Sequence, residues 1–243
     1  MAYLLHIESS TKVCSVALSC DGKLLACREE DSVSYSHSGL LTSFIEEVMR
    51  EANVPLNVLA AIAVSKGPGS YTGLRIGVST AKGLCYGLDI PLIGISTLQA
   101  LAVHCRDILA QRNNIIYPEA LEAIYCPMID ARRMEVYTGL FNDQIEPLQD
   151  IQALIVDPNS FAGILDEHKM LFFGDGAEKC RNILTRSNAI FIDGIKPSAS
   201  AMIPLATEKF NTSVTEDVAY FEPFYLKDFV AGKPKVKGLS QDF

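Results

Sequence analysis

Residues 66–77, KGPGSYTGLRIG, are the stretch of this chain whose residue types and spacing point most clearly to chemistry. They indicate the end of a strand, a glycine-rich turn and the start of a helix, where backbone amides can bind an anion. A P-loop requires a lysine after its second glycine, but Leu74 follows Gly73 here. A dinucleotide-binding turn requires glycine or alanine where this chain has Thr72. The local pattern therefore favours a tight turn, with Ser70 or Thr72 as the N-cap of the helix, over a phosphate loop.

Histidine and cysteine spacing gives no metal-binding signature. The chain has four histidines and seven cysteines, with no histidine pair at i, i+4 and no C-x-x-C. The odd number of cysteines indicates reduced, buried thiols of a cytosolic protein and not a disulfide framework. We therefore expect ordinary packed or exposed side chains at all four histidines, which are His6, His37, His104 and His168.

The helix expected over 72–88 is unusual because it contains four glycines. Each glycine inside a helix costs ~0.5–1 kcal/mol relative to alanine. Apolar residues run almost all the way round this helix and leave only a thin polar strip that includes Arg75 and Lys82. Such a helix is either buried or docks onto another surface. Two interpretations therefore stay open, a core helix and a helix at a subunit interface.

Charge and hydropathy limit the class of protein. The chain has 243 residues, of which 49% are hydrophobic and 21% charged, so we expect a sizeable core in one large domain or two lobes. Its net charge of -8 makes it a poor primary binder of nucleic acid. The opening MAYLLHIESS lacks the features of a signal peptide, and no apolar run reaches the ~18 residues that span a bilayer. We expect a cytoplasmic protein.

Hydrophobic periodicity predicts two lobes with a related order of elements. The first lobe, 1–112, is expected to contain strands over 3–7, 13–19, 23–27, 60–65 and 92–95, and helices over 40–52, 72–88 and 97–112. The second lobe, 113–243, is expected to contain strands over 123–128, 135–141, 150–156, 171–173 and 189–192. Its helices are expected to end near residue 168, to follow residue 177 and to cover 199–210. A flexible basic tail is expected from about residue 227.

Several motifs, taken in order, resemble one known family. These are IESSTKVCSVAL near the start, GPGSYTGLRIG with STAKGL, DARRMEVY at 130–137, GDGA at 174–177 and PFYLK at 223–227. Together they resemble the bacterial TsaB (YeaZ) family, which is related to the M22 glycoprotease-like family. The resemblance implies an α/β, actin-like (acetate kinase–hsp70–actin, RNase H-like) fold with two βββαβαβα-type lobes. This agrees with the order of elements.

The resemblance also implies a role in the synthesis of threonylcarbamoyladenosine beside the anticodon of tRNA. In that family TsaB is the non-catalytic partner of TsaD, which transfers the threonylcarbamoyl group, and the small ATPase TsaE joins the pair. We therefore expect a subunit that binds and stabilises TsaD as a heterodimer, helps to recruit TsaE and reaches tRNA through the complex. The docking surface could also pair two copies of this chain when TsaD is absent, and the sequence leaves monomer and dimer open for the isolated protein. No cofactor is expected on this chain alone, but ATP or ADP is expected in the assembled complex.

The pattern and the resemblance give three sets of candidate site residues. The TsaD-docking surface comprises Leu40, Leu41, Phe44, Val48, Gly73, Leu74, Arg75, Gly77, Val78, Ala81, Lys82 and Cys85, with Arg75 and Lys82 expected to set the register through charge pairs. The candidate anion or nucleotide contacts are Gly67, Gly69, Ser70, Thr72, Gly174, Asp175 and Gly176. The candidate tRNA contacts are Arg132, Arg133, Lys233, Lys235 and Lys237.

Departures from related enzymes predict that this chain has no catalytic residue and no metal. TsaD resembles a paralogue with a His-x-x-x-His motif, and Thr97 and Leu101 stand at those two positions. Glu8 replaces the usual Asp at the end of the first strand and is interpreted as a strand-end polar residue. Two alternatives stay open. An actin-like phosphotransferase needs a glycine that the turn at 9–12 lacks, and an M22-type peptidase needs metal ligands that this chain lacks.

Overall fold

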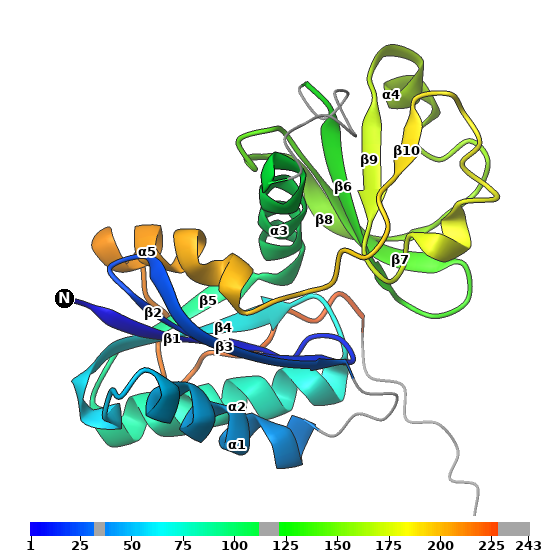
Figure 1. The fold of residues 1–243 in the computed structure, drawn as a ribbon. Helices are drawn as coiled ribbons and strands as arrows, with labels where there is room; N and C mark the ends of the chain where they lie inside the picture. The colour runs from blue at the N-terminus through cyan, green and yellow to red at the C-terminus, as the bar shows by residue number, and fades with distance from the viewer. Residues whose placement is uncertain (32–36, 112–121, 228–243) are drawn as a thin grey trace, which may run out of the picture.

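The first lobe is built on a five-stranded mixed sheet of order β3-β2-β1-β4-β5 (Figure 1). Its strands are β1 (Tyr3–Glu8), β2 (Val13–Cys20), β3 (Lys23–Asp31), β4 (Leu59–Gly67) and β5 (Leu92–Ser96). The first three form an antiparallel meander, and β4 and β5 add in parallel. Asp21 and Gly22 make the β2–β3 turn with φ of 47° and 77°, as their types favour. The structure is a computed structural model and describes residues 1–31, 37–111 and 122–227.

Two long helices cover one face of this sheet. They are α1 (His37–Glu51) and α2 (Tyr71–Leu88), and a short 3-10 turn, η1 (Leu56–Val58), follows α1. The apolar faces of both helices pack on Ile7, Val16 and Val64 in a single hydrophobic core. The helical periodicity of the sequence thus marks the side of each helix that the sheet buries.

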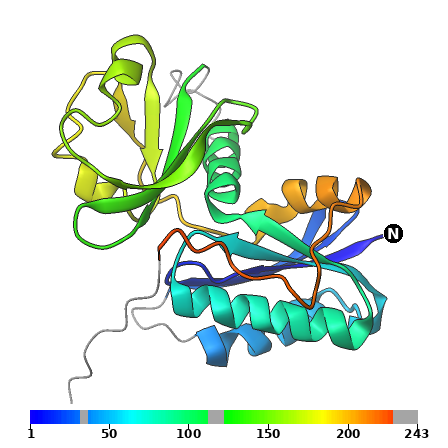
Figure 2. The same cartoon turned by 180° about the vertical axis from the view of Figure 1, so that it is seen from behind.

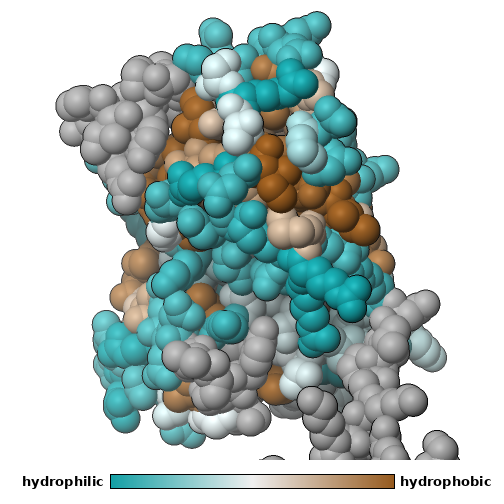
Figure 3. All heavy atoms as spheres, turned by 90° about the vertical axis from the view of Figure 1, so that its right-hand side faces the viewer, coloured by the Kyte–Doolittle hydropathy of each residue, from teal (hydrophilic) through white to brown (hydrophobic). Residues whose placement is uncertain are grey.

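The second lobe repeats this plan with smaller elements. Its sheet has the order β10-β9-β6-β7-β8, with the same antiparallel meander and the same parallel additions. Its strands are β6 (Ile124–Asp130), β7 (Glu135–Phe141), β8 (Pro147–Ile155), β9 (Met170–Phe173) and β10 (Ala189–Phe191). In place of α1 and α2 it has the short helix α4 (Ala162–Glu167) and the 3-10 turn η3 (Glu178–Cys180). Because α4 and η3 cover less of their sheet than α1 and α2 do, hydrophobic side chains reach the surface of the upper lobe in Figure 3.

The prediction of a helix after residue 177 is wrong. Only the 3-10 turn η3 forms there, although the residues have fair helix propensity. Lys179 reaches back to Asp130 and to the carbonyl of Glu135, and Arg181 pairs with Asp193. These tertiary contacts and the burial of Cys180 in the lobe's core override local propensity.

The two lobes exchange their last helices. α3 (Thr97–Gln111) follows β5, but its apolar face packs mainly on the second sheet, against Tyr125, Leu171 and Phe173. η4 (Ser200–Met202) and α5 (Ile203–Asn211) follow β10, but Met202 and Ala206 pack on the first sheet. Figure 1 shows α5 lying on the lower lobe and α3 standing between the lobes. The expected boundary at 112/113 lies outside the described residues. The strands of the first sheet precede this boundary and those of the second follow it, but α3 and α5 each pack on the sheet from the other side of the boundary.

A segment that we call the C-terminal strap, residues 216–227, returns to the first lobe. The Glu216 amide donates to the Leu92 carbonyl (2.8 Å), and the Phe224 amide donates to the Lys66 carbonyl (2.6 Å). Figure 2 shows the strap running along α2 toward the second lobe. There Lys227 pairs with Glu135. The strap thus joins both lobes, and the expected basic tail beyond it lies outside the described residues.

Candidate functional site

A cleft of about 1120 Å³ lies between the two lobes. The β1–β2 turn and the loop before α2 line it from the first lobe, and the β6–β7 turn and Asp175 line it from the second. The end of the strap, residues 224–227, lines it as well. The cleft thus brings together several of the predicted site residues, namely Gly69, Ser70, Thr72, Arg132 and Asp175.

The two walls of the cleft are built alike. β1 ends at Glu8 and β6 ends at Asp130, and a turn of four residues leads each into the next strand, at 9–12 and 131–134. A G-x-G loop faces each turn, GPG after β4 and GDG after β9. The first glycine of each loop has positive φ, 110° at Gly67 and 100° at Gly174. The two lobes therefore correspond residue by residue at this edge, although the sequence shows no obvious repeat.

The second glycine of each loop allows the loop to pack on its own lobe. A Cβ on Gly69 would collide with the carbonyl of Ser10. A Cβ on Gly176 would lie 2.8 Å from the carbonyl carbon of Ile129. Because Cβ atoms essentially never approach other atoms so closely, both positions require glycine for internal packing.

The backbone amides of these loops donate to the chain's own acceptors. In the first lobe the Ser70 amide donates to the Ser10 carbonyl (2.6 Å), and the Ser10 amide donates to Glu8 Oε1 (2.6 Å). In the second lobe the Asp130 amide donates to Asp175 Oδ1 (2.9 Å), and the Arg132 amide donates to Asp130 Oδ1 (3.0 Å). Carboxylates of the protein therefore stand where an anionic ligand would need free donors, and the predicted anion contacts stay a prediction.

The N-terminus of α2 is capped as the sequence indicates. Ser70 is the N-cap, and its Oγ accepts from the Gly73 amide at 3.3 Å. Thr72, the other candidate cap, is exposed within the first turn of the helix.

Buried polar groups lie behind the first turn. Glu8 is fully buried, and burial raises the pKa of its carboxyl, against the opposing effect of hydrogen bonds from Ser10 and Ser65. His6 is also fully buried, shares a hydrogen bond with Ser19 Oγ (2.8 Å), and burial lowers its pKa to about 3. Both side chains are therefore held toward their neutral forms by the low polarity of the core.

Neither histidine position of the paralogue's motif is exposed here. Thr97 and Leu101 are both fully buried. Within residues 1–31, 37–111 and 122–227, no three His, Cys, Asp or Glu side chains are grouped so that they could hold a metal ion. The absence of a metal stays a prediction for the purified protein.

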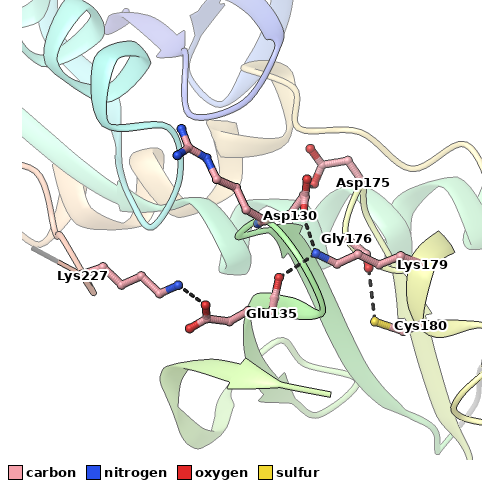
Figure 4. Close-up of polar contacts among 8 residues, drawn as sticks. Asp130, Glu135, Asp175, Gly176, Lys179, Cys180 and Lys227 are labelled. Atoms are coloured by element: carbon pink, nitrogen blue, oxygen red, sulfur yellow. Dashed lines mark hydrogen bonds and ion pairs between the residues drawn. The ribbon is translucent and has the colours of Figure 1, made fainter. Parts of the chain in front are cut away.

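Charges of both signs line the cleft. Lys196 pairs with Asp31 at 2.7 Å and so links the two lobes. In the second lobe Lys179 pairs with Asp130, and Lys227 pairs with Glu135 (Figure 4). Desolvation raises the pKa of Asp175, and the nearby Asp130 adds to this, against a hydrogen bond from the Asp130 amide.

The structure corrects the predicted docking surface for nine of its residues. These are buried within the first lobe: Leu41, Phe44, Val48, Gly73, Leu74, Gly77, Val78, Ala81 and Cys85. Leu40 is partly buried against the same core. A Cβ on Gly77 would collide with Ser9 Oγ and lie 3.6 Å from Ile7. The small residues on this side of α2 thus let it approach β1 and do not face a partner.

The predicted charge pairs of Arg75 and Lys82 with a partner stay a prediction, but both side chains already have acceptors within the chain. Lys82 Nζ donates to the carbonyls of Ala219 (3.1 Å) and Phe221 (3.0 Å) in the strap. Arg75 Nε donates to the Tyr225 hydroxyl (3.4 Å), and its guanidinium lies over the Tyr71 ring at 4.3 Å. The polar strip of α2 therefore binds the chain's own C-terminal strap.

The glycines on another face of α2 have no such explanation within the chain, and this face was not part of the predicted docking surface. A Cβ on Gly83 or Gly87 would meet no atom within 4 Å, and Tyr86 is 86% exposed. The signal was present in the sequence, because Gly73, Gly77 and Ala81 recur on one helical face while Gly83 and Gly87 fall on another. Only the position of the sheet decides which of the two faces is internal.

The candidate tRNA contacts divide into two groups. Arg132 and Arg133 are exposed in the β6–β7 turn, and Arg132 lines the cleft. Lys233, Lys235 and Lys237 lie outside the described residues. No helix in the described part of the chain is long and apolar enough to cross a bilayer.

Comparisons with known proteins agree over most of the chain. The family model "TsaD: tRNA N6-adenosine threonylcarbamoyltransferase" matches residues 31–235. The "tRNA threonylcarbamoyladenosine biosynthesis protein TsaB" of Escherichia coli (strain K12) is 26% identical over 95% of this chain and 96% of that protein. The protein of the same name from Haemophilus influenzae is 29% identical over 95% of each chain. The solved structure of YeaZ from Pseudomonas aeruginosa has a TM-score of 0.77 and 25% identity, covering 93% of this chain and all of that one.

These matches bear on both the fold and the family. The actin-like, RNase H-like fold with two lobes, expected from the sequence, is confirmed. The motifs that carried the resemblance lie on corresponding turns of the two lobes, on α2 and on the strap. The chain belongs to the TsaB (YeaZ) family, within the wider group of proteins that the TsaD family model matches.

Proposed function

We propose that this chain is a non-catalytic subunit in the biosynthesis of tRNA threonylcarbamoyladenosine, where it binds and stabilises TsaD and helps to recruit TsaE. Membership of the TsaB family supports the pathway, since its relatives are named for it. The partnership with TsaE rests on the family resemblance alone. We also propose that the surface that binds TsaD can pair two copies of this chain when TsaD is absent.

The outer face of α2 is the observation that carries the partnership with TsaD. Interior glycines destabilise a helix, so they persist where a backbone must approach closely. Gly77 has such a reason inside the lobe, but Gly83 and Gly87 have none within 4 Å. Beside them Tyr86 is almost fully exposed, and tyrosine is favoured at protein interfaces. We assign the docking surface to Gly83, Tyr86 and Gly87, where a partner helix approaches the α2 backbone.

The geometry of the cleft favours a subunit without catalysis of its own. An actin-like phosphotransferase needs free amides in its two turns, and here the turn amides of Ser10 and Arg132 donate to Glu8 and Asp130. A serine peptidase needs an accessible nucleophile beside a base. The hydrogen bond between Ser19 and His6 is of that kind, but both residues are fully buried. We therefore propose neither alternative, and we assign ATP or ADP only to the assembled complex.

The test places a leucine on the outer face of α2. Gly83→Leu and Gly87→Leu fill space that is open in the isolated chain, so both variants should fold and melt at or above the wild-type temperature. Gel filtration should then show loss of co-elution with TsaD, and a reconstituted complex should lose tRNA modification.

Two matched glycines serve as controls. Gly163→Leu in α4 also fills open space but lies on the second lobe, so it should leave TsaD binding intact. Gly77→Leu should overpack the core and lower the free energy of unfolding by ~1–3 kcal/mol. Wild-type affinity of the folded Gly83→Leu variant for TsaD would refute the assigned surface.

A further inference from the structure

The β6–β7 turn presents two consecutive arginines, of which Arg132 lines the cleft. Arg132 and Arg133 are both exposed and have φ of 72° and 48°. Left-handed backbone is uncommon for such side chains, and two in succession need a structure that holds them. Here the Arg132 amide donates to Asp130 Oδ1 (3.0 Å), the Ala131 amide donates to the Glu135 carbonyl (3.0 Å) and the Glu135 amide donates to the Arg132 carbonyl (3.1 Å). The turn is therefore fixed by its main chain, and both guanidinium groups are left free to bind.

The nearest carboxylates do not neutralise these arginines. Asp130 and Glu135 flank the turn, but Lys179 pairs with the first and Lys227 with the second (Figure 4). Within the part of the chain that the structure describes, neither Arg132 nor Arg133 takes part in a side-chain hydrogen bond or an ion pair. A chain of net charge -8 thus carries an uncompensated cationic pair at one fixed point.

The neighbouring side chains extend this cationic character across the mouth of the cleft. Lys12, on the equivalent turn of the first lobe, lines the same cleft, whereas Lys227 is paired with Glu135 and adds no further free charge. Asp175 is the opposing group, but its Oδ1 already accepts from the Asp130 amide. The guanidinium group of arginine is planar, and its N–H donors match the spacing of two phosphate oxygens. Two adjacent arginines on one turn can therefore bind the phosphates of a polyanion.

We infer that Arg132 and Arg133 bind the phosphate backbone of an RNA, which brings the β6–β7 turn into contact with tRNA. This inference rests on the proposed function, because that function supplies an RNA substrate. It concerns phosphates and not bases, since an exposed two-residue turn offers contacts to a backbone but no pocket for a base edge. The turn therefore adds affinity without sequence preference, beside whatever larger RNA surface the partner provides.

The experiment measures tRNA binding by the chain assembled with TsaD, using fluorescence anisotropy between 50 and 200 mM salt. The test variant is Arg132→Asn with Arg133→Asn, because asparagine tolerates left-handed backbone and so preserves the turn. Each lost phosphate contact should reduce the slope of log affinity against log salt by about one. Binding at low salt should weaken several-fold. The variant Arg132→Lys with Arg133→Lys keeps both charges and should retain most of the wild-type slope.

A matched control removes the same charge elsewhere. Lys23 and Lys169 are exposed residues at the opposite ends of the two sheets from the cleft, so Lys23→Ala with Lys169→Ala should leave the slope unchanged. An unchanged slope in the asparagine variant, or an equal loss in the control, would overturn the inference. So would displacement of tRNA by millimolar ATP at constant ionic strength from the wild-type complex but not from the complex of the asparagine variant, because the two arginines would then bind free phosphates.

The result also separates this inference from the proposed function. Loss of co-elution with TsaD in the asparagine variant would make the turn a protein interface and would overturn the inference. If the wild-type chain itself failed to co-elute with TsaD, the proposed function would fail. The same salt titration on the isolated chain would still test the turn, with a smaller slope expected for the asparagine variant than for the wild type.

Discussion

At the scale of single residues, β1 carries two buried titratable side chains on one face. His6 and Glu8 are both fully buried, and their pKa values are shifted in opposite directions. The cause is the same, because removal from water disfavours the charged form of each. Neither group can ionise without a cost to the fold, so both link the stability of the first lobe to pH.

His6 should make the protein less stable in acid. Its pKa is about 3 in the folded chain and ordinarily 6.5, so below pH 6.5 the unfolded state takes up a proton that the folded state does not. Stability is therefore lost as the pH falls from 6.5 toward 3, by up to about 1.4 kcal/mol per pH unit. Glu8 acts in the opposite sense: its folded pKa is raised, so stability falls as the pH rises above its ordinary value.

Comparison with His6→Gln isolates the histidine. Urea unfolding at pH 6.5, 5.5 and 4.5 should show the stability of the wild type falling relative to that of the variant, by about 1 kcal/mol per pH unit. Because Glu8 is present in both proteins, its opposing contribution cancels in the difference. Parallel pH profiles would mean that His6 gains its proton without unfolding.

At the scale of elements, the C-terminal strap holds the first lobe together from outside its sheet. It adds a backbone hydrogen bond to β5, and Val218 and Phe221 pack on the lobe's core. A chain that ends at residue 215 should lose at least about 2 kcal/mol of unfolding free energy, the scale of one or two buried apolar side chains. A chain that ends at residue 227 should unfold at the wild-type urea concentration.

A point variant guards against non-specific effects of truncation. Phe221→Ala keeps the length of the chain and removes one packed side chain. Its loss of unfolding free energy should therefore lie between the losses of the two truncated chains. Equal unfolding midpoints for the chains ending at residues 215 and 227 would show that the strap does not stabilise the lobe.

The strap also shows what sequence patterns could and could not predict. Periodicity predicts most strands and the helices α1, α2 and α3 because each reflects contacts within a few residues. It predicts that Lys82 lies on a polar strip, but its acceptors are 137 and 139 residues away in the chain. Likewise the apolar face of α3 is evident, whereas its packing on the second sheet depends on the path of the whole chain. The glycine-rich turns in the sequence identify several residues of the cleft. The sequence does not show which glycines of α2 face the sheet and which face outward.

At the scale of the whole molecule, the cleft resembles a ligand site in which the chain's own acceptors already bind several backbone amides. Isolated protein should therefore show no more than about 1 °C of thermal shift with 1 mM ATP and magnesium. A nucleotide present at 100 times its Kd would add about 2.7 kcal/mol to stability, which raises the melting temperature by several degrees in a protein of this size. A saturable shift of that size, absent with magnesium alone, would contradict our reading of the two turns.

The exchange of α3 and α5 between the lobes has a consequence for how the protein is made. The last strand of the first sheet ends at Ser96, but the helix that covers its second face begins only at Ile203. On a ribosome that adds 5–20 residues per second, about a hundred residues take roughly 5–20 s. For that time the nascent chain exposes the apolar face that holds Leu4, Ala61 and Ile93. The first lobe is therefore translated first but completed last, because the burial of this face requires synthesis of the chain as far as α5.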